Sequence, residues 1–213
     1  MNDRLEELYG LRKQSSRPDP LDDLIRTILS QNTTDVNRDR AYTELRKQYP
    51  SWGDLYSANR SELKEAIRVA GLAEQKSSAI TASLEWLMET RGSLDMDWIC
   101  DEDPEEMIRA FTQIKGIGVK TVSIVLCFAC GKEVFPVDTH VNRICKRLGF
   151  VSVKSSPNRT FRIMADLIPE GKSRSLHLNM IRLGREICKA RSPQCSACVL
   201  LPQCEYGQEN LQE

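Results

Sequence analysis

The sequence contains no hydrophobic run approaching the roughly 20 residues that a membrane-spanning helix needs. Its N-terminal stretch, MNDRLEELYG, carries too many charges for the apolar core of a secretory signal. Low-complexity tracts are also absent, and a composition with 40% hydrophobic and 28% charged residues is typical of a folded globular protein. We therefore expect a protein of the cytoplasm that has no membrane partner.

The sequence also lacks any alternation of apolar and polar residues long enough to indicate a β-strand. Apolar residues recur instead at helical spacing, as in DPLDDLIRTILSQ, where Asp19 can cap a helix and Pro20 can begin it. Asp103 and Pro104 repeat this start signal in DPEEMIRAFTQI. The sequence therefore predicts an all-α fold, and 213 residues suffice for one large domain or two modest ones.

The net charge is zero, but the charges are unevenly distributed. Residues 1–131 carry 17 Lys and Arg against 22 Asp and Glu, whereas residues 132–191 carry 13 against 5. A basic stretch is commonly no more than a solvated face, although it can also attract a polyanion such as nucleic acid. Charge alone does not decide between these interpretations.

A glycine-bearing turn precedes an apolar helix in IKGIGVKTVSIVLCFAC, residues 114–130. Gly116 and Gly118 can adopt conformations that a side chain forbids and can let the backbone approach a ligand. The first N–H groups of the following helix lack partners within it, an arrangement that binds anions such as a DNA phosphate. The similar IRVAGLAEQKSSAI at 67–80 indicates either a repeated helix-hairpin-helix unit or a coincidence, since this connection is common.

Two residues near this turn have both a chemical and a structural interpretation. Lys120 stands in the first helical turn, where the helix dipole and partial burial would favour a neutral, nucleophilic amine; otherwise it extends into solvent or contacts a phosphate. Asp138, in FPVDTHVNRICKRLG, can cap the helix that follows it. A carboxylate beside a lysine nucleophile would also assist its deprotonation or stabilise a cationic sugar carbon.

The cysteines divide into a clustered group and a pair in the apolar helix. The C-terminal group is spaced C-x6-C-x2-C-x5-C, at Cys188, Cys195, Cys198 and Cys204. Clustered cysteines in a reducing compartment indicate a metal site, and this spacing fits an iron-sulfur cluster better than the paired short knuckles of zinc sites. By contrast, we expect Cys127 and Cys130 (a C-x2-C) to pack as small hydrophobic residues rather than to act in redox chemistry.

Together, IKGIGVKT, VDTH and the four-cysteine spacing resemble endonuclease III, of the helix-hairpin-helix DNA glycosylase superfamily, over nearly the whole chain from LIRTILSQNTTD to CEYG. The resemblance implies two helical lobes with a DNA-binding cleft between them. One lobe would be a six-helix barrel over 22–132. The other would join 1–21 to 133–213 and carry a [4Fe-4S] cluster.

The resemblance also implies residue roles. Lys120 would attack the sugar C1′ of a flipped nucleotide, and Asp138 would be its acidic partner. The clustered cysteines would hold the [4Fe-4S] cluster. The implied DNA contacts come from Gln31, Asn32, Lys115, Gly116, Gly118, Val119 and His140.

Two positions depart from the usual pattern of the family. The helix break usually reads S-A-Q-x-T-D, and its glutamine fills the gap left by the flipped base. Here SQNTTD places Asn32 in that position and Gln31 one residue earlier. Lys115 stands where the family turn commonly has proline, so it can add a phosphate contact.

These features lead to the prediction of a monomeric, bifunctional DNA glycosylase and abasic-site lyase of base excision repair. It would act on oxidised pyrimidines in duplex DNA, cleave the strand by β-elimination, and associate with the nucleoid if its source is a prokaryote. Two alternatives remain open: a glycosylase for deaminated or mismatched pyrimidines, and a non-catalytic iron-sulfur protein that only binds DNA.

Overall fold

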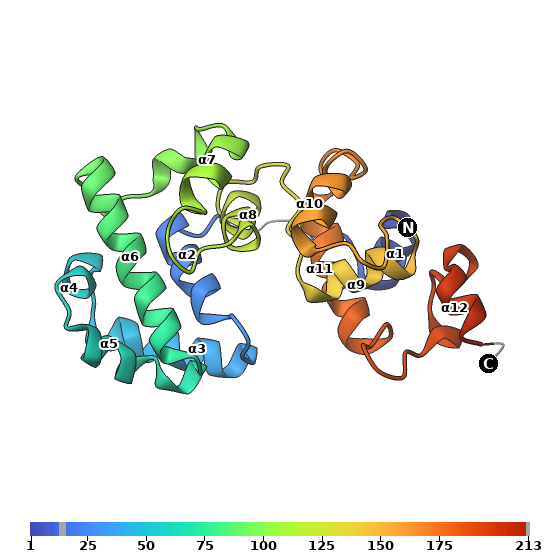
Figure 1. The fold of residues 1–213 in the computed structure, drawn as a ribbon, viewed down its shortest axis with the longest axis horizontal. Helices are drawn as coiled ribbons and strands as arrows, with labels where there is room; N and C mark the ends of the chain where they lie inside the picture. Colours follow the sequence, from blue (N-terminus) through green and yellow to red (C-terminus); the bar gives the residue numbers. More distant parts are fainter. Residues whose placement is uncertain (13–15, 212–213) are drawn as a thin grey trace. The chain divides into compact units, whose positions relative to one another are not determined.

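The structure, a computed structural model, describes residues 1–12 and 16–211. Every regular element in these ranges is a helix, which confirms the predicted all-α fold (Figure 1). No helix in the described part of the chain is long and apolar enough to cross a membrane.

The chain divides into two compact units. One unit is Arg17–Lys132, and the other combines Met1–Ser16 with Glu133–Glu213. The helices of the first unit are α2 (Pro20–Leu29), α3 (Asp35–Gln48), α4 (Trp52–Tyr56), α5 (Arg60–Ala66), η1 (Arg68–Ala70), α6 (Ala73–Arg91), η2 (Asp97–Cys100), α7 (Pro104–Phe111) and α8 (Val119–Phe128). The helices of the second are α1 (Asn2–Tyr9), α9 (Thr139–Arg147), α10 (Pro157–Ala165), α11 (Ser173–Glu186), η3 (Cys195–Ala197), η4 (Leu201–Gln203) and α12 (Glu205–Glu209).

The predicted helix starts are confirmed at α2 and α7. The Asp19 carboxylate accepts a hydrogen bond from the N–H of Asp22 at 2.7 Å, and Pro20 is the first helical residue. The Asp103 carboxylate likewise accepts from the N–H groups of Glu105 and Glu106, both at 3.0 Å, before Pro104 begins α7. Each cap satisfies N–H groups that have no partner within the helix.

In the first unit, α2 packs against α8. Ile25 and Ile28 of α2 are fully buried, and Val122 and Val125 of α8 are each 1% exposed. Burying side chains of this size stabilises the fold by about 1.5–3 kcal/mol each. The apolar stretch of the sequence is therefore the inner helix of this unit, and its first turn is held in place by the core.

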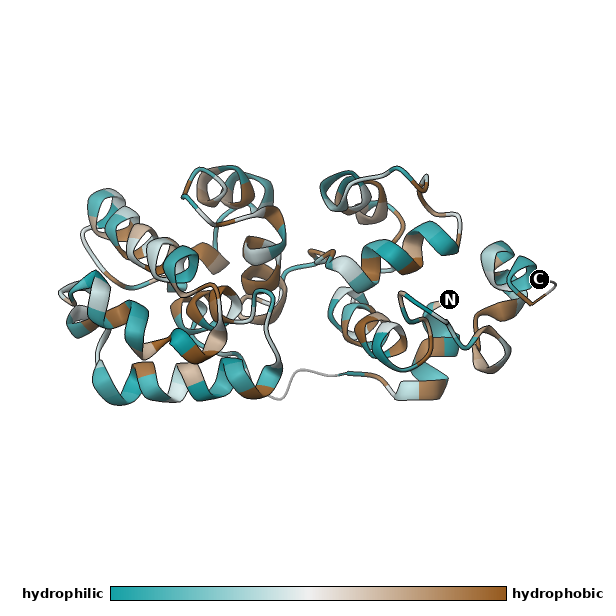
Figure 2. Ribbon diagram, turned by 60° about the horizontal axis from the view of Figure 1, so that its bottom comes forward, coloured by the Kyte–Doolittle hydropathy of each residue, from teal (hydrophilic) through white to brown (hydrophobic). Residues whose placement is uncertain are grey.

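In the second unit, the N-terminal helix α1 packs against α11. Lys172 forms an ion pair with Glu6 at 2.9 Å, and the Asn179 amide donates to the carbonyl oxygen of Gly10 at 3.1 Å. Figure 2 shows hydrophobic and hydrophilic residues interspersed along the helices of both units, as expected of helices with one buried face. The N-terminal residues thus complete the hydrophobic core of the C-terminal unit.

One of the two cysteines expected only to pack in the core has a different role. Cys130 forms a disulfide with Cys100, and the two Cα atoms are 4.8 Å apart. The packing prediction was therefore wrong for Cys130, because its partner lies 30 residues away and only the fold brings the two together. Cys127 is buried inside α8, as expected.

Candidate active site and cysteine pocket

The glycine turn between α7 and α8 packs against the long helix α6. Gly116 has a φ of +90°, and a Cβ atom at this position would lie 2.7 Å from the Cβ of Ala79. The expectation that a side chain is forbidden here is confirmed. It was wrong for Gly118, which has extended backbone with a φ of −108° and would have open space around an added Cβ.

The first turn of α8 leaves backbone donors available for a ligand. Gly118, the N-cap residue, supplies no side-chain cap, and the first backbone bonds run from the N–H groups of Thr121 and Val122 to its carbonyl oxygen. The N–H groups of Val119 and Lys120 therefore point beyond the end of the helix. Unpaired donors at the positive end of a helix dipole form a site for an anion.

Lys120 stands on the exposed side of this first turn. Its expected partial burial was wrong, because Thr121 and Val122 take the inward positions of the turn. Lys120 is the second residue of α8, and both it and Lys115, in the turn before the helix, are exposed.

Asp138 is the N-cap of α9 in the other unit. Its carboxylate accepts a hydrogen bond from the N–H of Val141 at 2.7 Å, which confirms the capping interpretation, and its side chain is partly buried. The segment before it is fixed by buried His177 of α11, whose Nδ1 lies 2.8 Å from the carbonyl oxygen of Pro136. Since a carbonyl oxygen only accepts, this Nδ1 carries a proton.

His140, an implied DNA contact, packs against α11. Arg143 donates to its Nδ1 at 3.1 Å, so the second nitrogen, Nε2, carries the proton of the neutral ring. A Cβ at Gly184 would lie 2.7 Å from the same Nδ1, so glycine makes room for the imidazole. The Nε2–H group is therefore the donor that the ring can offer to a ligand.

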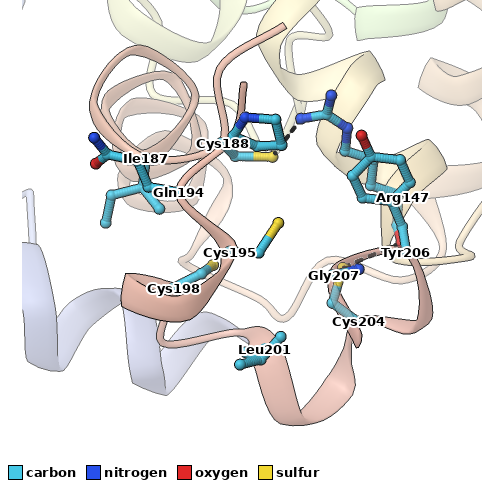
Figure 3. Close-up of a pocket in the computed structure, with 11 residues that line it drawn as sticks. Arg147, Ile187, Cys188, Gln194, Cys195, Cys198, Leu201, Cys204, Tyr206 and Gly207 are labelled. Carbon is cyan, nitrogen blue, oxygen red and sulfur yellow. Dashed lines mark hydrogen bonds between the residues drawn. The ribbon is translucent and has the colours of Figure 1, made fainter. Parts of the chain in front are cut away.

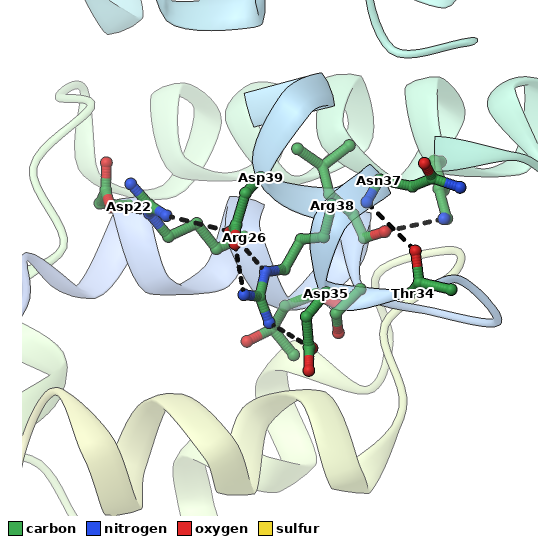
Figure 4. Close-up of polar contacts among 11 residues, drawn as sticks. Asp22, Arg26, Thr34, Asp35, Asn37, Arg38 and Asp39 are labelled. Carbon is green, nitrogen blue, oxygen red and sulfur yellow. Dashed lines mark hydrogen bonds and ion pairs between the residues drawn. The ribbon is translucent and has the colours of Figure 1, made fainter. Parts of the chain in front are cut away.

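The loop between α2 and α3 carries Gln31, which is partly buried, and Asn32, which is exposed. Asn32 has a φ of +48°, in the left-handed region that asparagine tolerates better than most residues. The loop ends at Thr34, whose hydroxyl caps α3 by accepting from the N–H of Asn37 at 3.2 Å. Next to this cap, Arg38 pairs with Asp35 at 2.9 Å (Figure 4).

A second exposed residue with left-handed backbone was not predicted. Leu72, at the turn before α6, has a φ of +48° and is 45% exposed. A leucine with positive φ is uncommon, and such residues concentrate at functional sites. A tertiary structure was needed to find it, because nothing in the letters AGLAEQ specifies this backbone.

The four clustered cysteines line one pocket (Figure 3). Arg147 donates to the Cys188 sulfur at 3.1 Å, and the N–H of Gly207 lies 3.3 Å from the Cys204 sulfur. Burial is the main cause that raises the pKa of Cys198 and of Cys204, and neighbouring cysteines in the pocket raise it further. Thiolates gathered here therefore need a cation to stabilise them.

Several cations of the basic stretch serve the structure itself. Arg143 donates to the carbonyl oxygens of Gly184 at 2.9 Å and Cys188 at 2.8 Å, and Arg182 pairs with Glu186 at 2.8 Å. Seven others make no side-chain hydrogen bond or ion pair within the described residues. They are Lys132, Lys146, Lys154, Arg159, Arg162, Lys189 and Arg191. Two cations of the stretch, Lys172 and Arg182, are paired with carboxylates, and these pairs reduce its net positive charge.

Comparisons with known proteins agree on one family. Residues 25–170 match the HhH-GPD superfamily of base excision DNA repair proteins. The chain is 34% identical to endonuclease III of Thermotoga maritima over 88% of its own length and 84% of the relative's. It is also 34% identical to endonuclease III of Sulfolobus acidocaldarius, of which it covers 82%. A candidate DNA glycosylase of Arabidopsis thaliana is 39% identical, and the chain spans about half (51%) of its length.

Among solved structures, a trapped covalent intermediate of endonuclease III with DNA superposes with a TM-score of 0.83 at 28% identity, covering 99% of this chain and 95% of that one. A thermostable thymine-DNA glycosylase shares the fold, with a TM-score of 0.81 at 23% identity, over 98% of this chain and 95% of that one. From the matched residues and these similarities, the chain belongs to the HhH-GPD superfamily of base excision DNA repair proteins and is a homologue of endonuclease III.

Proposed function

We propose that this protein is a bifunctional DNA glycosylase and abasic-site lyase that removes oxidised pyrimidines from duplex DNA. The observation that carries the proposal is Lys120, an exposed amine in the first turn of α8 beside two unpaired backbone N–H groups. A clamp that only bound DNA would need the N–H groups and no amine at this position. An enzyme that opens a sugar needs both.

The glycine turn before α8 and the Lys120 amine have separate roles in this proposal. The N–H groups of Val119 and Lys120 bind a backbone phosphate and so hold the neighbouring sugar in place. The Lys120 amine attacks C1′, and the base leaves with the electron pair of the broken glycosidic bond and takes up a proton. The sugar ring opens to an imine with the lysine; loss of a C2′ proton then expels the 3′ phosphate, and water releases the enzyme.

Asp138 supplies the negative charge for this reaction. A carboxylate accepts the proton that the Lys120 ammonium must lose before its amine attacks, and it stabilises cationic character at C1′. Asp138→Asn should keep the cap of α9, since asparagine caps as well as aspartate, and should change the free energy of unfolding by less than about 0.5 kcal/mol. Base excision should slow by at least about 100-fold, the usual contribution of a placed acid or base. Single-turnover excision and thermal unfolding of both proteins check this; an unchanged excision rate contradicts the role.

Incision of lesion-bearing duplexes tests the substrate class. Duplexes that carry thymine glycol, dihydrouracil, uracil, a G:T mismatch or an abasic site are compared at equal enzyme concentration. We expect thymine glycol and dihydrouracil to be cut faster than uracil or G:T. Preference for uracil or G:T instead would assign the protein to deaminated or mismatched pyrimidines, and no incision of any duplex would leave only a DNA-binding role.

We further propose that the four-cysteine pocket holds a [4Fe-4S] cluster. Zinc sites usually combine two short C-x2-C pairs, whereas here one such pair is flanked by single cysteines. A cluster instead binds each cysteine to a different iron. N–H donors to two of the sulfurs suit thiolate ligands, as the bonds to Cys188 and Cys204 show.

In this assignment Cys188, Cys195, Cys198 and Cys204 hold the cluster, which would organise the loop from Cys188 to α12. Protein purified without oxygen should contain about four irons per chain and be yellow-brown. Stoichiometric zinc in a colourless preparation would contradict the assignment.

A further inference from the structure

Lys76 is a charged side chain in an unusual environment. It is 1% exposed, in the second turn of α6, and lysine is almost never fully buried unless it is paired with a carboxylate. Lys76 forms no ion pair within the described part of the chain. Its Nζ instead donates to two backbone carbonyl oxygens, those of Leu29 and Ala70, both at 2.8 Å.

Each of these carbonyls lies at the base of a loop. Leu29 is the last residue of α2, directly before the loop that carries Gln31 and Asn32. Ala70 is the last residue of η1, directly before the turn that carries Leu72. Each loop contains an exposed residue with a φ of +48°, Asn32 or Leu72, so one ammonium group joins the bases of the two loops that have left-handed, non-glycine residues among the described residues of this unit.

The bond to Leu29 completes the C-terminal end of α2. The carbonyl oxygens of the last turn lack partners within a helix. Here the N–H of Ser30 bonds to the carbonyl of Arg26, the Ser30 hydroxyl donates to Thr27 at 2.7 Å, and the N–H of Gln31 donates to Ile28 at 3.3 Å. Lys76 satisfies the remaining carbonyl, that of Leu29, with a cation at the negative end of the helix dipole.

The same lysine also holds the second loop through its backbone. Its N–H donates to the carbonyl oxygen of Leu72 at 3.0 Å, so the turn is bonded to Lys76 on both sides of Gly71. One turn further along α6, Ala79 packs against Gly116 in the glycine turn between α7 and α8. The start of α6 therefore fixes both loops on a helix that also supports the phosphate-binding turn.

We infer that Lys76 is a positioning residue, which fixes the Gln31–Asn32 loop and the Leu72 turn relative to each other so that both engage DNA at a damaged site. The inference rests on the proposed function and on the resemblance to endonuclease III, which places Asn32 where the family glutamine fills the gap left by the flipped base. Among the described residues, Lys76 is the buried cation that bonds to the backbone at the base of both loops.

Hydrogen exchange tests the structural part without any DNA. Lys76→Met keeps a long unbranched side chain and removes the donors. We expect the amides at 30–33 and 70–72 to exchange about tenfold faster in Lys76→Met. A tenfold change corresponds to the loss of one buried hydrogen bond worth about 1.4 kcal/mol. Exchange at 114–122 should stay the same. Lys47→Met, at an exposed lysine of α3, is the matched control and should change neither segment. Equal exchange in Lys76→Met and the wild type would overturn the inference.

DNA binding tests the functional part. The ratio of affinities for a duplex with a tetrahydrofuran abasic analogue and for an undamaged duplex should fall by about tenfold in Lys76→Met, as expected when positioning is lost far from the chemistry. In an Asn32→Ala background, Lys76→Met should lower the ratio by less than about twofold, because the two residues act through one loop. Fully additive effects, or an unchanged ratio with faster exchange, would overturn the inference. Wild-type protein without any abasic-site preference would refute the proposed function instead, since the exchange result does not depend on it.

Should Lys76→Met fail to fold, Lys76→Gln provides the second test. Its amide can still donate to one carbonyl, so one loop should keep slow exchange while the other becomes faster. Equal slow exchange of both loops in Lys76→Gln would contradict a role for the ammonium group.

Discussion

At the scale of single residues, Gly116 and Gly118 look alike in the sequence but differ in the structure. A methyl group at Gly116 would collide with Ala79 and would require a φ of +90°, whereas a methyl group at Gly118 meets open space in extended backbone. Gly116→Ala should therefore lower the free energy of unfolding by about 1–3 kcal/mol. Gly118→Ala should lower it by about 1 kcal/mol or less, the cost of replacing glycine by alanine at an N-cap.

Tryptophan fluorescence is a direct measurement for this prediction. Trp52, Trp86 and Trp98 all lie in the unit Arg17–Lys132, so denaturant unfolding followed by their emission reports on that unit. Both variants should also bind every duplex more weakly, because a phosphate contact positions the DNA without reading its sequence. Equal stability losses in the two variants would contradict the packing of Gly116 against α6.

Lys76 makes the stability of the same unit depend on pH. Burial lowers its pKa from 10.5 to about 8. Between these pH values the unfolded chain binds a proton that the folded chain has lost, so the contribution of Lys76 to stability rises with pH. The free energy of unfolding of the wild type, relative to Lys76→Met, should therefore increase by about 3 kcal/mol from pH 7.5 to 10.5. A difference that stays constant or falls over this range contradicts the burial of the amine.

At the scale of elements, the predictions that succeeded depended on short-range signals. Asp19 with Pro20 and Asp103 with Pro104 specify helix starts within four residues, and Asp138 caps α9 as expected. The short helix α4 was not predicted, although Ser51 and Asp54 form a capping box at its start.

The residues that were misjudged depend on contacts distant in sequence. Lys76 resembles the other polar residues of an amphipathic helix, and its burial follows only from the positions of α2 and η1. Lys120 was expected to be partly buried because its neighbours are apolar, but those neighbours occupy the inward face. The pairing of Cys130 with Cys100 is a tertiary contact of the same kind.

The disulfide joins η2 to the residues after α8 and closes a loop of 30 residues. Constraining the unfolded chain in this way stabilises the folded state by about 2–4 kcal/mol. A dithiol reductant should therefore lower the unfolding midpoint followed by tryptophan fluorescence. The double variant Cys100→Ala with Cys130→Ala should already be less stable and should not respond to reductant. A wild-type midpoint that reductant leaves unchanged would contradict the cross-link.

At the scale of the whole molecule, the residues proposed for catalysis and for the cluster are divided between the two units, of which one is a continuous stretch and the other combines both ends of the chain. The glycine turn and Lys120 belong to Arg17–Lys132, whereas Asp138 and the cysteine pocket belong to the unit that α1 completes. The order of motifs along the chain identified the family, and the folded units show which residues support each motif.

The central claim is that Lys120 forms a covalent imine with the opened sugar, and borohydride trapping tests it most directly. When borohydride is added during reaction with an abasic-site duplex, the wild type should become covalently joined to the DNA. Lys120→Ala should give no adduct yet keep its affinity for the duplex within about threefold, because backbone N–H groups bind the phosphate. Lys115→Ala, at the neighbouring exposed lysine, should still be trapped. Undiminished trapping of Lys120→Ala would place the nucleophile at another residue and contradict the account.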